Sequence, residues 1–299
     1  MLELYEELSA ISTTERDVPL KKMTTLRVGG EAAYVVYPEN EMSLDAIMRI
    51  IRKNSIPFKV IGKGSNLLCG DGRYEGVIIR LDRHFTDFFF DGEYVTVQAG
   101  CSIIALAQEA AKRGLSGLEF ASGIPATVGG TVFMNAGAYK ASMSDVVEEV
   151  FVYRDGSLCW MEKDSFEYAY RTSIFQKHPD WIITAVRLKL KQGDPDEIRQ
   201  LMENRRERRF ATQPLNYPSC GSVFRNPEGM NSWKLIDEIG YRGHVHGGAC
   251  VSQKHPNFIV NLGNATALDY LQLVEEIQDR IEEKFGIRLI TEMEKFNCR

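Results

Sequence analysis

The run Ala121-Ser-Gly-Ile-Pro-Ala-Thr-Val-Gly-Gly-Thr-Val-Phe-Met-Asn-Ala-Gly-Ala-Tyr139 is the densest glycine segment of the chain. Its glycines and alanines alternate with Phe133, Met134 and Asn135, a mixture unlike a flexible linker or a simple turn. Glycine allows positive φ and lets another group approach the backbone closely. Consecutive N–H groups in such a turn can form an anion-binding concavity, so the run predicts a phosphate or diphosphate site. The alternative is a tight loop that binds nothing.

Two further glycine segments precede this run. VIGKGSNLL, residues 60–68, has Leu67 where a dinucleotide fingerprint needs its third glycine, and no G-x-x-x-x-G-K-[ST] phosphate loop exists. A Rossmann or P-loop nucleotide site is therefore not expected. TTLRVGG, residues 24–30, brings the cation Arg27 near a turn. Three such segments in one half of the chain fit a cofactor with a long diphosphate.

The residues around these segments predict a mixture of helices and strands. Apolar runs at 32–38 and 58–62 flank a segment with apolar residues at helical spacing, which indicates strand, helix and strand. A helix is expected from about Ser102 to Arg113, and a hairpin that turns at Asp155-Gly156.

The C-terminal third is predicted to form a separate domain. A polar, charge-rich helix ending at a proline predicts an interdomain connection with a boundary near residue 205. A short helix is expected at Trp233–Ile239, and a long one begins at Thr266, with Asp269 in capping-box register. The apolar face predicted for the long helix comprises Leu268, Leu271, Val274, Ile277 and Ile281.

Length and composition limit the class of protein. The 299 residues suffice for about two domains. Lys+Arg 36 against Asp+Glu 41 gives a net charge of −5, which argues against a nucleic-acid partner. No apolar run approaches the roughly 20 residues of a membrane helix, and the N-terminus is acidic, unlike a signal peptide. We expect a cytoplasmic protein without membrane insertion.

Cysteine and histidine give little sign of a metal. The six cysteines are scattered without a C-x-x-C pair, so they are expected to be reduced thiols. His244-Val245-His246 resembles a metal pair, but the sequence offers no third ligand. No metal site is predicted.

Six motifs occur in the order typical of one enzyme family. They are TTLRVGG, VIGKGSNLL, GLEFASGIPATVGGTVFMNAGAY, YRTSIF, PSCGSVFRNP and GGACVSQKHPNFIVN. Over about residues 24–292 the chain resembles the UDP-N-acetylenolpyruvoylglucosamine reductases, bacterial flavoenzymes that make UDP-N-acetylmuramate for peptidoglycan. The short connection after Arg171 is similar to the compact subtype of this family.

The resemblance implies an α+β fold with two domains. Residues 20–200 are expected to form an FAD-binding domain of the vanillyl-alcohol-oxidase type, in two lobes split near residue 81. Residues 205–299 are expected to form a smaller α+β substrate-binding domain. The implied cofactor is FAD, and the implied co-substrate is NADPH. In the family's reaction the reduced flavin passes hydride from N5 to the enolpyruvyl group of UDP-N-acetylglucosamine enolpyruvate, which leaves negative charge to be stabilised and a carbon to be protonated.

Three residues match the family's catalytic positions. Ser222, in CGSVF, corresponds to the proton donor, and Arg171, in YRTS, to the arginine that stabilises the developing enolate. Glu292, in LITEM, matches the catalytic glutamate, although Ile290 and Met293 depart from the family's usual leucine–glutamate–x–glutamate–valine pattern. Glu294 lies close enough in sequence to be the alternative. The role of Glu292 would be to share a proton with the substrate carboxylate or enolate.

The remaining site residues are also assigned through the resemblance. The cofactor-binding set is Arg27, Gly62, Gly64, Ser65, Asn66, Gly123, Thr127, Gly129, Gly130, Asn135, Gly137 and Ala138. The substrate-binding set, chosen because a diphosphate needs cations and uracil needs amides, is Arg225, Asn226, Lys234, Arg242 and Asn257.

Two other functions remain open at this point. The same cofactor fold hosts oxidases and dehydrogenases of alcohols or hydroxy acids, and fold alone does not choose the substrate. A non-catalytic UDP-sugar-binding protein is the third possibility, although such a protein would not need the paired acid and cation proposed above.

Overall fold

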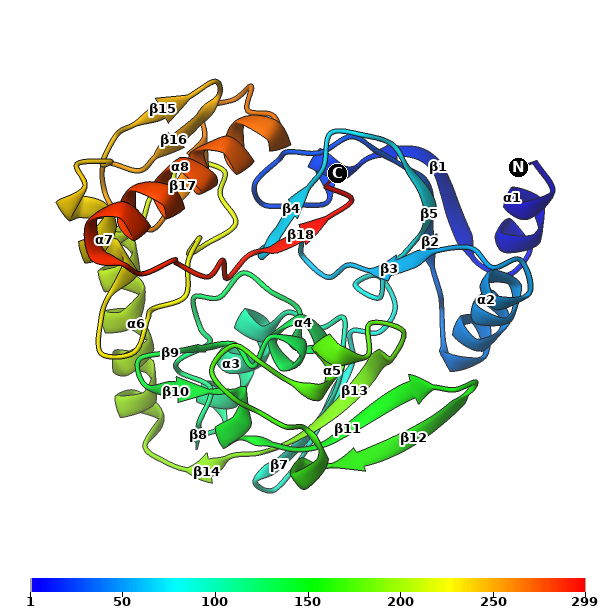
Figure 1. Cartoon of the computed structure of the whole chain (residues 1–299). Coiled ribbons are helices and arrows are strands. Elements are labelled where there is room, and N and C mark those ends of the chain that lie inside the picture. The colour runs from blue at the N-terminus through cyan, green and yellow to red at the C-terminus, as the bar shows by residue number, and fades with distance from the viewer. Residues whose placement is uncertain (1, 299) are drawn as a thin grey trace. The chain divides into compact units, whose positions relative to one another are not determined.

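The computed structural model describes residues 2–298 (Figure 1), and the chain divides into two compact units. Unit 1 comprises residues 2–16, 33–63 and 75–207, and unit 2 comprises residues 17–32, 64–74 and 208–298. The boundary expected near residue 205 lies close to the junction of Glu207 and Arg208, but two N-terminal segments belong to unit 2. One of them contributes strand β4 (Leu67–Cys69), which pairs in parallel with β18 (Glu294–Phe296). Such a long-range pairing leaves no local mark in the sequence.

A four-stranded sheet, most of whose residues lie in unit 1, has the order β1-β2-β5-β3. Its strands are β1 (Thr13–Pro19), β2 (Glu31–Tyr37), β3 (Phe58–Val60) and β5 (Tyr74–Ile79). The predicted strand, helix and strand are confirmed as β2, α2 (Glu41–Lys53) and β3, but β5 lies between the two strands. Helix α1 (Leu2–Ser9) packs against α2.

Helix α2 shows why this segment is helical. Asn40 and Ser43 form a capping box, in which each side chain accepts from the backbone N–H of the other residue. One face buries Leu44, Ile47, Met48 and Ile51 in the core of unit 1. Because the cap satisfies otherwise unpaired N–H groups and the spacing keeps the apolar residues on one face, the helix begins at Glu41.

The second sheet of unit 1 is antiparallel, with the order β12-β11-β13-β7-β6. Its strands are β6 (Phe88–Asp91), β7 (Tyr94–Gln98), β11 (Val147–Arg154), β12 (Ser157–Glu162) and β13 (Ile182–Lys189). The predicted hairpin is confirmed, because Asp155 (φ 51°) and Gly156 (φ 83°) form its two-residue turn. Positive φ at both positions suits the twist of paired strands.

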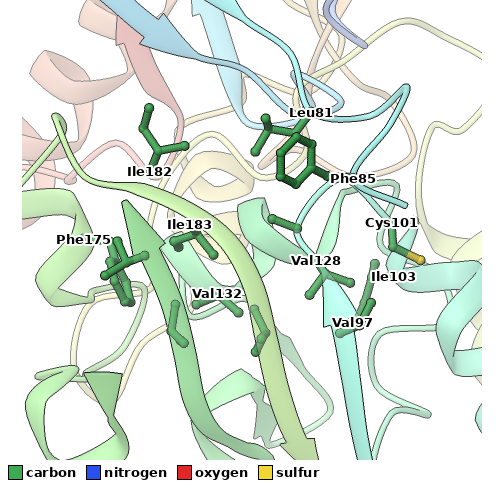
Figure 2. Packing of buried hydrophobic residues seen from close by; sticks show 14 of the residues in the cluster. Leu81, Phe85, Val97, Cys101, Ile103, Val128, Val132, Phe175, Ile182 and Ile183 are labelled. Carbon is green, nitrogen blue, oxygen red and sulfur yellow. The ribbon is translucent and has the colours of Figure 1, made fainter. Parts of the chain in front are cut away.

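Three helices accompany this sheet: α3 (Ile103–Lys112), α4 (Val128–Phe133) and α5 (Ile174–Lys177). Helix α3 confirms the segment expected from 102 to 113, and Ser102 is its N-cap. Figure 2 shows how residues of α3, α4 and β7 converge, with Ile103, Val128, Val132 and Val97 packed in one buried cluster. This core fixes the position of α4 and hence of the glycine run.

Unit 2 contains a three-stranded antiparallel sheet and two helices. The strands are β15 (Val245–His246), β16 (Ala249–Val251) and β17 (Ile259–Asn261), and the helices are α7 (Ser232–Glu238) and α8 (Ala267–Phe285). The predicted capping box of α8 is confirmed, since Thr266 and Asp269 bond each other's N–H groups. Its buried face is rotated from the prediction: Tyr270 and Leu273 are buried, whereas Leu268 is 59% exposed. The apolar residues at both 270 and 273 move the centre of the face away from Leu268.

Helix α6 (Pro195–Thr212) contains the junction of the two units. Ile198 is its only buried residue; most of the others are charged or polar, and Leu201 and Phe210 are exposed. The expected boundary therefore lies inside a helix, because a helix that buries so little apolar surface can connect units without belonging to either core. The described helices, of which α6 and α8 are the longest, include none with the length and apolar content needed to cross a membrane.

The remaining elements are short. They are η1 (Leu20–Lys22), β8 (Leu115–Ser116), β9 (Gly137–Ala138), β10 (Ala141–Ser142), η2 (Met143–Asp145), η3 (Lys163–Ser165) and β14 (Lys191–Gln192). Strands β9 and β10 form a hairpin at the end of the glycine run.

Candidate active site

The glycine run of unit 1 is packed against its own protein. Thr127 caps α4, and its hydroxyl accepts the N–H of Gly130 at 3.3 Å. The N–H of Gly129 donates to the carbonyl of Ala99 at 2.8 Å. The first turn of α4 therefore uses the N–H groups of Gly129 and Gly130 within the protein, and an anion-binding concavity at this run would have to use other donors. A helix start that packs on a strand end has its donors already satisfied.

Two glycines in this region are required by close packing. A Cβ on Gly62 would lie 2.4 Å from Oγ1 of Thr127, and a Cβ on Gly129 would lie 2.9 Å from the Cβ of Ala99. Both distances are shorter than a side chain tolerates. The glycines thus bring two loops and a strand end together, which is a different use from the anion contact expected of them.

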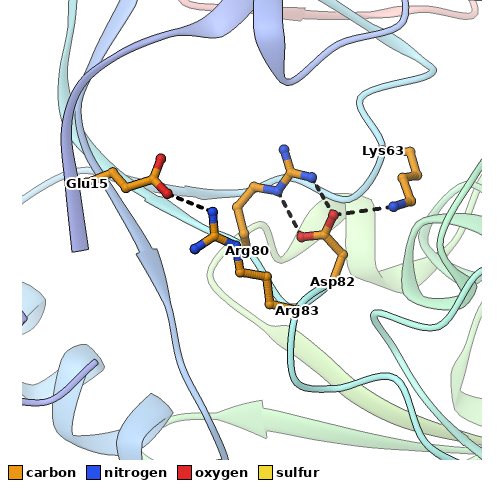
Figure 3. Close-up of polar contacts among 5 residues, drawn as sticks. All are labelled: Glu15, Lys63, Arg80, Asp82 and Arg83. Carbon is orange, nitrogen blue, oxygen red and sulfur yellow. Dashed lines mark hydrogen bonds and ion pairs between the residues drawn. The ribbon is translucent and has the colours of Figure 1, made fainter. Parts of the chain in front are cut away.

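The loop of residues 62–65 behaves differently. Its four consecutive N–H groups donate to no acceptor within residues 2–298. Lys63 is held by Asp82, whose Oδ2 is 3.4 Å from its Nζ and which also bonds Arg80 (Figure 3). Burial alone would raise the pKa of Asp82, but Arg80 and then Lys63 outweigh it and lower the pKa. The loop is thus anchored by a charge network while its N–H groups stay available to an anion.

The segment of residues 24–30 lies in unit 2 beside Gly64. The N–H of Thr25 donates to the carbonyl of Gly64 at 3.3 Å, and a Cβ on Gly64 would lie 2.8 Å from the Cα of Thr24. The hydroxyl of Thr24 is buried and bonds to nothing among the described residues. Buried hydroxyls are rarely left without a partner, so this group is another candidate for a bound anion.

Arg27 and Asn261 were not expected to be linked. Arg27 is exposed with φ 58°, and the amide of Asn261 donates to the carbonyls of Leu26 and Arg27 at 3.1 and 3.3 Å. Asn261 is buried in β17. It lies in the motif that contributed to the family resemblance, but its contact with residues distant in sequence could only be found in the structure.

Arg171 lies in unit 1 at the third position of a tight turn. Ala169 and Thr172 exchange backbone hydrogen bonds of 3.2 and 3.0 Å across this turn. Arg171 has φ 56°, and its guanidinium donates to the carbonyl of Gly137 at 2.7 Å. Its charged group also lies 5.2 Å from the centre of the Tyr170 ring. The predicted catalytic cation is therefore held beside the glycine run.

Ser222 follows Gly221, which has φ 80°, in unit 2. The next residues are fixed by Asn257: its Oδ1 accepts the N–H of Phe224 at 3.0 Å and its Nδ2 donates to the Phe224 carbonyl at 2.9 Å. The N–H of Val223 donates to the Asn257 carbonyl at 2.9 Å. Ser222 is half-buried and lies at the start of this fixed segment.

Glu292 is brought next to the Ser222 segment. Its N–H donates to the carbonyl of Val223 at 2.7 Å, and its carbonyl accepts from the Asn66 amide at 3.2 Å. Glu294, the alternative, begins β18 two residues later. Burial raises the pKa of Cys220 to about 11, and the charge of Glu292 adds to this rise. The segments that carry Ser222 and Glu292 are therefore neighbours in unit 2, whereas Arg171 belongs to unit 1.

The predicted substrate-binding residues fall into two groups. Three have their polar groups engaged with protein: Asn226 accepts from the N–H of Ser232, Arg242 makes two 2.9 Å bonds to Asp237, and Asn257 holds Phe224. Lys234 is exposed on α7, with Nζ 5.6 Å from the Trp233 ring centre. Arg225 is half-buried, and its N–H donates to the carbonyl of Ile290. The sequence alone did not distinguish the residues whose polar groups bond to the protein from Lys234 and Arg225.

The histidine pair does have an acidic neighbour. His246 Nδ1 lies 2.8 Å from Glu276 Oε1, and His244 Nε2 lies 3.4 Å from Oε2 of the same carboxylate. Among residues 2–298, no group of three or more His, Cys, Asp or Glu side chains is arranged to hold a metal ion. The ring of His246 also contacts Gln272 on α8, through Nε2 at 2.9 Å.

Comparison with known proteins identifies the class first. The profile of the FAD binding domain matches residues 32–162, and that of the UDP-N-acetylenolpyruvoylglucosamine reductase C-terminal domain matches residues 213–296. A crystal structure of the UDP-N-acetylenolpyruvylglucosamine reductase from Thermus caldophilus superposes with a TM-score of 0.82 and 40% identity, covering 95% of this chain and 99% of that one. The fold is thus an α+β flavoprotein fold, with an FAD-binding domain and a smaller C-terminal domain.

Full-length relatives then give the family. The UDP-N-acetylenolpyruvoylglucosamine reductase of Anoxybacillus flavithermus is 42% identical over 98% of both chains. That of Bacillus subtilis is 40% identical over 92% of this chain and 91% of its own. The chain belongs to the UDP-N-acetylenolpyruvoylglucosamine reductase family. It is an FAD-dependent oxidoreductase that reduces the enolpyruvyl group of UDP-N-acetylglucosamine enolpyruvate in peptidoglycan synthesis, which confirms the first of the three functions considered from the sequence.

Proposed function

We propose that NADPH supplies the electrons for this reduction, that Ser222 protonates the substrate, and that Arg171 and Glu292 stabilise the enolate. The observation that carries the proposal is the 2.7 Å bond from the N–H of Glu292 to the carbonyl of Val223. This backbone bond holds the segment that carries the Glu292 carboxyl beside the segment that carries the Ser222 hydroxyl. A donor and an acid on neighbouring segments suit a reaction that creates negative charge and then protonates carbon.

The chain's own residues fit a diphosphate-bearing cofactor. The acceptor-free N–H groups of residues 62–65 and the unpartnered hydroxyl of Thr24 are the donors that a diphosphate would satisfy. Of the rest of the proposed cofactor set, Asn66 positions the chain at Glu292, and Gly123, Gly137 and Ala138 lie within or beside the glycine run. When bound, FAD accepts hydride from the reductant and transfers it to the substrate.

Ser222 would donate its hydroxyl proton to the carbon next to the substrate carboxylate. A serine hydroxyl is a weak acid, so it needs an orientation that is fixed before the reaction and a strongly basic acceptor. Gly221 and the Asn257 contacts with Phe224 supply the fixed backbone on which this depends. Glu292 would hydrogen-bond the substrate carboxylate as negative charge develops there.

Arg171 would pair with that carboxylate through its permanently charged guanidinium. A planar guanidinium can donate two parallel hydrogen bonds to a carboxylate, which a lysine cannot match. Its Nη2 donates to the carbonyl of Gly137, and this bond orients the plane of the group. In unit 2, Lys234 and Arg225 are the cations proposed for the UDP diphosphate. Asn226, Arg242 and Asn257 are proposed to act on the substrate through the loops that they hold.

The test separates the two halves of the reaction. In Ser222→Ala, flavin reduction by NADPH should stay within twofold of the parent rate, since no proton from Ser222 is needed there. Anaerobic reoxidation by the enolpyruvyl substrate should slow by about 10²–10⁴-fold. Stopped-flow absorbance of the flavin measures both rates. Ser157→Ala, at the exposed first residue of β12, is the matched control. Unchanged reoxidation in Ser222→Ala would overturn the assignment of Ser222, and a flavin that NADPH does not reduce would overturn the role of NADPH.

A cytoplasmic location belongs to the same proposal. The six cysteines are free thiols, and thiols persist in a reducing compartment. NADPH would be available there as a soluble reductant. Fractionation of cells that carry a tagged chain tests the location directly.

A further inference from the structure

The turn that carries Arg171 has a backbone conformation that arginine does not favour. In a tight turn with positive φ at its third position, glycine or asparagine is usual. Arg171 occupies this position with φ 56°, and a side chain in the left-handed region costs about 1–2 kcal/mol. Such a conformation persists only where the surrounding structure imposes it. The contacts that impose it can be named.

Gln176, on α5, holds the arginine from one side. Its Nε2 donates to the carbonyl of Arg171 at 3.1 Å and to the carbonyl of Phe133 at 2.9 Å. The hydroxyl of Ser173 donates to the same Phe133 carbonyl at 2.6 Å. Because a carboxamide has two N–H groups on one nitrogen, Gln176 connects the Arg171 backbone to the end of α4 with a single side chain.

Asn135 holds the turn from the other side. It is 5% exposed, its Nδ2 donates to the carbonyl of Ala169 at 3.0 Å, and its Oδ1 accepts the N–H of Ser144 at 3.0 Å. The orientation of the Asn135 amide is therefore fixed, since a flipped amide would set its oxygen against the carbonyl of Ala169 and its NH2 group against the N–H of Ser144. Asn135 was expected to contact the cofactor, but both polar atoms of its side chain are occupied by protein.

We propose that Asn135 and Gln176 are positioning residues for Arg171. The side-chain amides of Asn135 and Gln176 lock the Ala169–Thr172 turn in the conformation that presents the Arg171 guanidinium beside Gly137. This inference rests on the catalytic role proposed above for Arg171. The two amides attach the turn at the carbonyls of Ala169 and Arg171, the residues that begin the turn and carry the charge. Asn135 itself belongs to the end of the glycine run, and Gln176 bonds to the carbonyl of Phe133 in the same run. The arginine is thereby fixed to the same run as its Gly137 partner.

The first variant is Gln176→Met, which has nearly the same shape but no donor. With the amide gone, the carbonyl of Arg171 loses its fixed partner and the turn can relax, so the guanidinium shifts. A displacement of about 1 Å in a catalytic group can cost on the order of 100-fold. We expect anaerobic reoxidation by the enolpyruvyl substrate to slow about 10- to 100-fold, while flavin reduction by NADPH and FAD affinity stay within twofold. Gln200→Met, on the exposed face of α6, is the matched control.

A double-mutant cycle shows whether Gln176 acts through the arginine. If it does, adding Gln176→Met to Arg171→Lys slows reoxidation little beyond Arg171→Lys alone, because the group being positioned is already impaired. Multiplying effects would mean that Gln176 has a general structural role, and the positioning proposal would fail. If Arg171→Lys itself leaves reoxidation unchanged, the proposed catalytic role of Arg171 fails instead. The two failures are thus distinguishable.

Asn135→Asp guards against a variant that does not fold. It keeps the acceptor for Ser144 and the shape of the side chain, but it sets a carboxylate oxygen against the carbonyl of Ala169. Slower reoxidation with unchanged FAD affinity would support the positioning role. Weaker FAD binding with reoxidation unaffected at saturating FAD would return Asn135 to the cofactor and overturn its part of the proposal.

Discussion

In the loop of Ser222 the left-handed residue is Gly221, whereas in the loop of Arg171 it is the arginine itself. Both loops are held by a buried asparagine that uses both ends of its amide: Asn257 bonds Phe224, and Asn135 bonds Ala169 and Ser144. The arginine loop has an additional clamp in Gln176.

The difference follows from which residue must face the reaction. Where the functional side chain is next to the bend, glycine can make the bend without strain, and one clamp on the following residues suffices. Where the functional residue occupies the bend, its own Cβ opposes the conformation, so the surrounding structure has to hold it. Three kinds of substitution test this comparison of the two loops, in order of expected effect. The first removes the asparagine clamp, the second adds a Cβ at the glycine, and the third removes the Cβ at the arginine.

The largest effect is expected from Asn257→Leu in unit 2. The change removes the partners of both the N–H and the carbonyl of Phe224, which is itself buried. Each buried polar group left without a partner costs about 1–3 kcal/mol, so the free energy of unfolding should fall by about 2–4 kcal/mol. Urea unfolding followed by tryptophan fluorescence measures this loss.

The control is Asn231→Leu, because Asn231 is exposed and its side chain makes no capping bond to α7. That change should alter the free energy of unfolding by no more than about 0.5 kcal/mol. Equal losses in the two variants would show that the Ser222 loop does not depend on the Asn257 clamp.

Local patterns in the sequence predicted the elements that local interactions determine. The Asp155-Gly156 turn, the helix capped by Ser102 and the capping box at Thr266 each depend on residues a few positions apart, and all three are confirmed. The prediction of the buried face of α8 was less accurate, because tyrosine is neither clearly polar nor clearly apolar in a sequence pattern, whereas Tyr270 is fully buried.

The contacts of the site depend on residues far apart, which periodicity cannot reveal. The membership of residues 17–32 and 64–74 in unit 2 follows from pairings such as β4 with β18. Gln176 carried no signal, since a polar residue at a short helix is usually exposed. Asn257 was predicted to bind the substrate, whereas its amide bonds the backbone of Phe224, because an amide suits a uracil and a backbone equally well.

A smaller effect is expected from Gly221→Ala. The nearest atom to a Cβ there would be the carbonyl oxygen of Ser65 at 3.9 Å, so there is room for the Cβ, and only the backbone conformation opposes it. With φ 80°, alanine should lower the free energy of unfolding by about 1–2 kcal/mol. Gly72→Ala is the control, because Gly72 has open space and no positive φ. A neutral Gly221→Ala would indicate that the loop is free to change its conformation.

The smallest and most discriminating effect compares Arg171→Gly with Arg171→Ala. Both variants lose the guanidinium and its bond to Gly137, so the difference between them reports the backbone alone. At φ 56°, glycine is the better residue, and Arg171→Gly should be more stable than Arg171→Ala by about 1 kcal/mol. Thermal unfolding of the two FAD-loaded variants measures this difference.

The same pair of changes at Arg49 should give the opposite sign. Arg49 lies on the exposed side of helix α2, where alanine exceeds glycine by about 1 kcal/mol in helix stability. A reversal of sign between positions 49 and 171 would isolate the strain that the turn imposes on its arginine. If alanine were better at both positions, the Ala169–Thr172 turn would be relaxing when the side chain is removed, and the clamps would be weaker than the hydrogen bonds of Asn135 and Gln176 indicate.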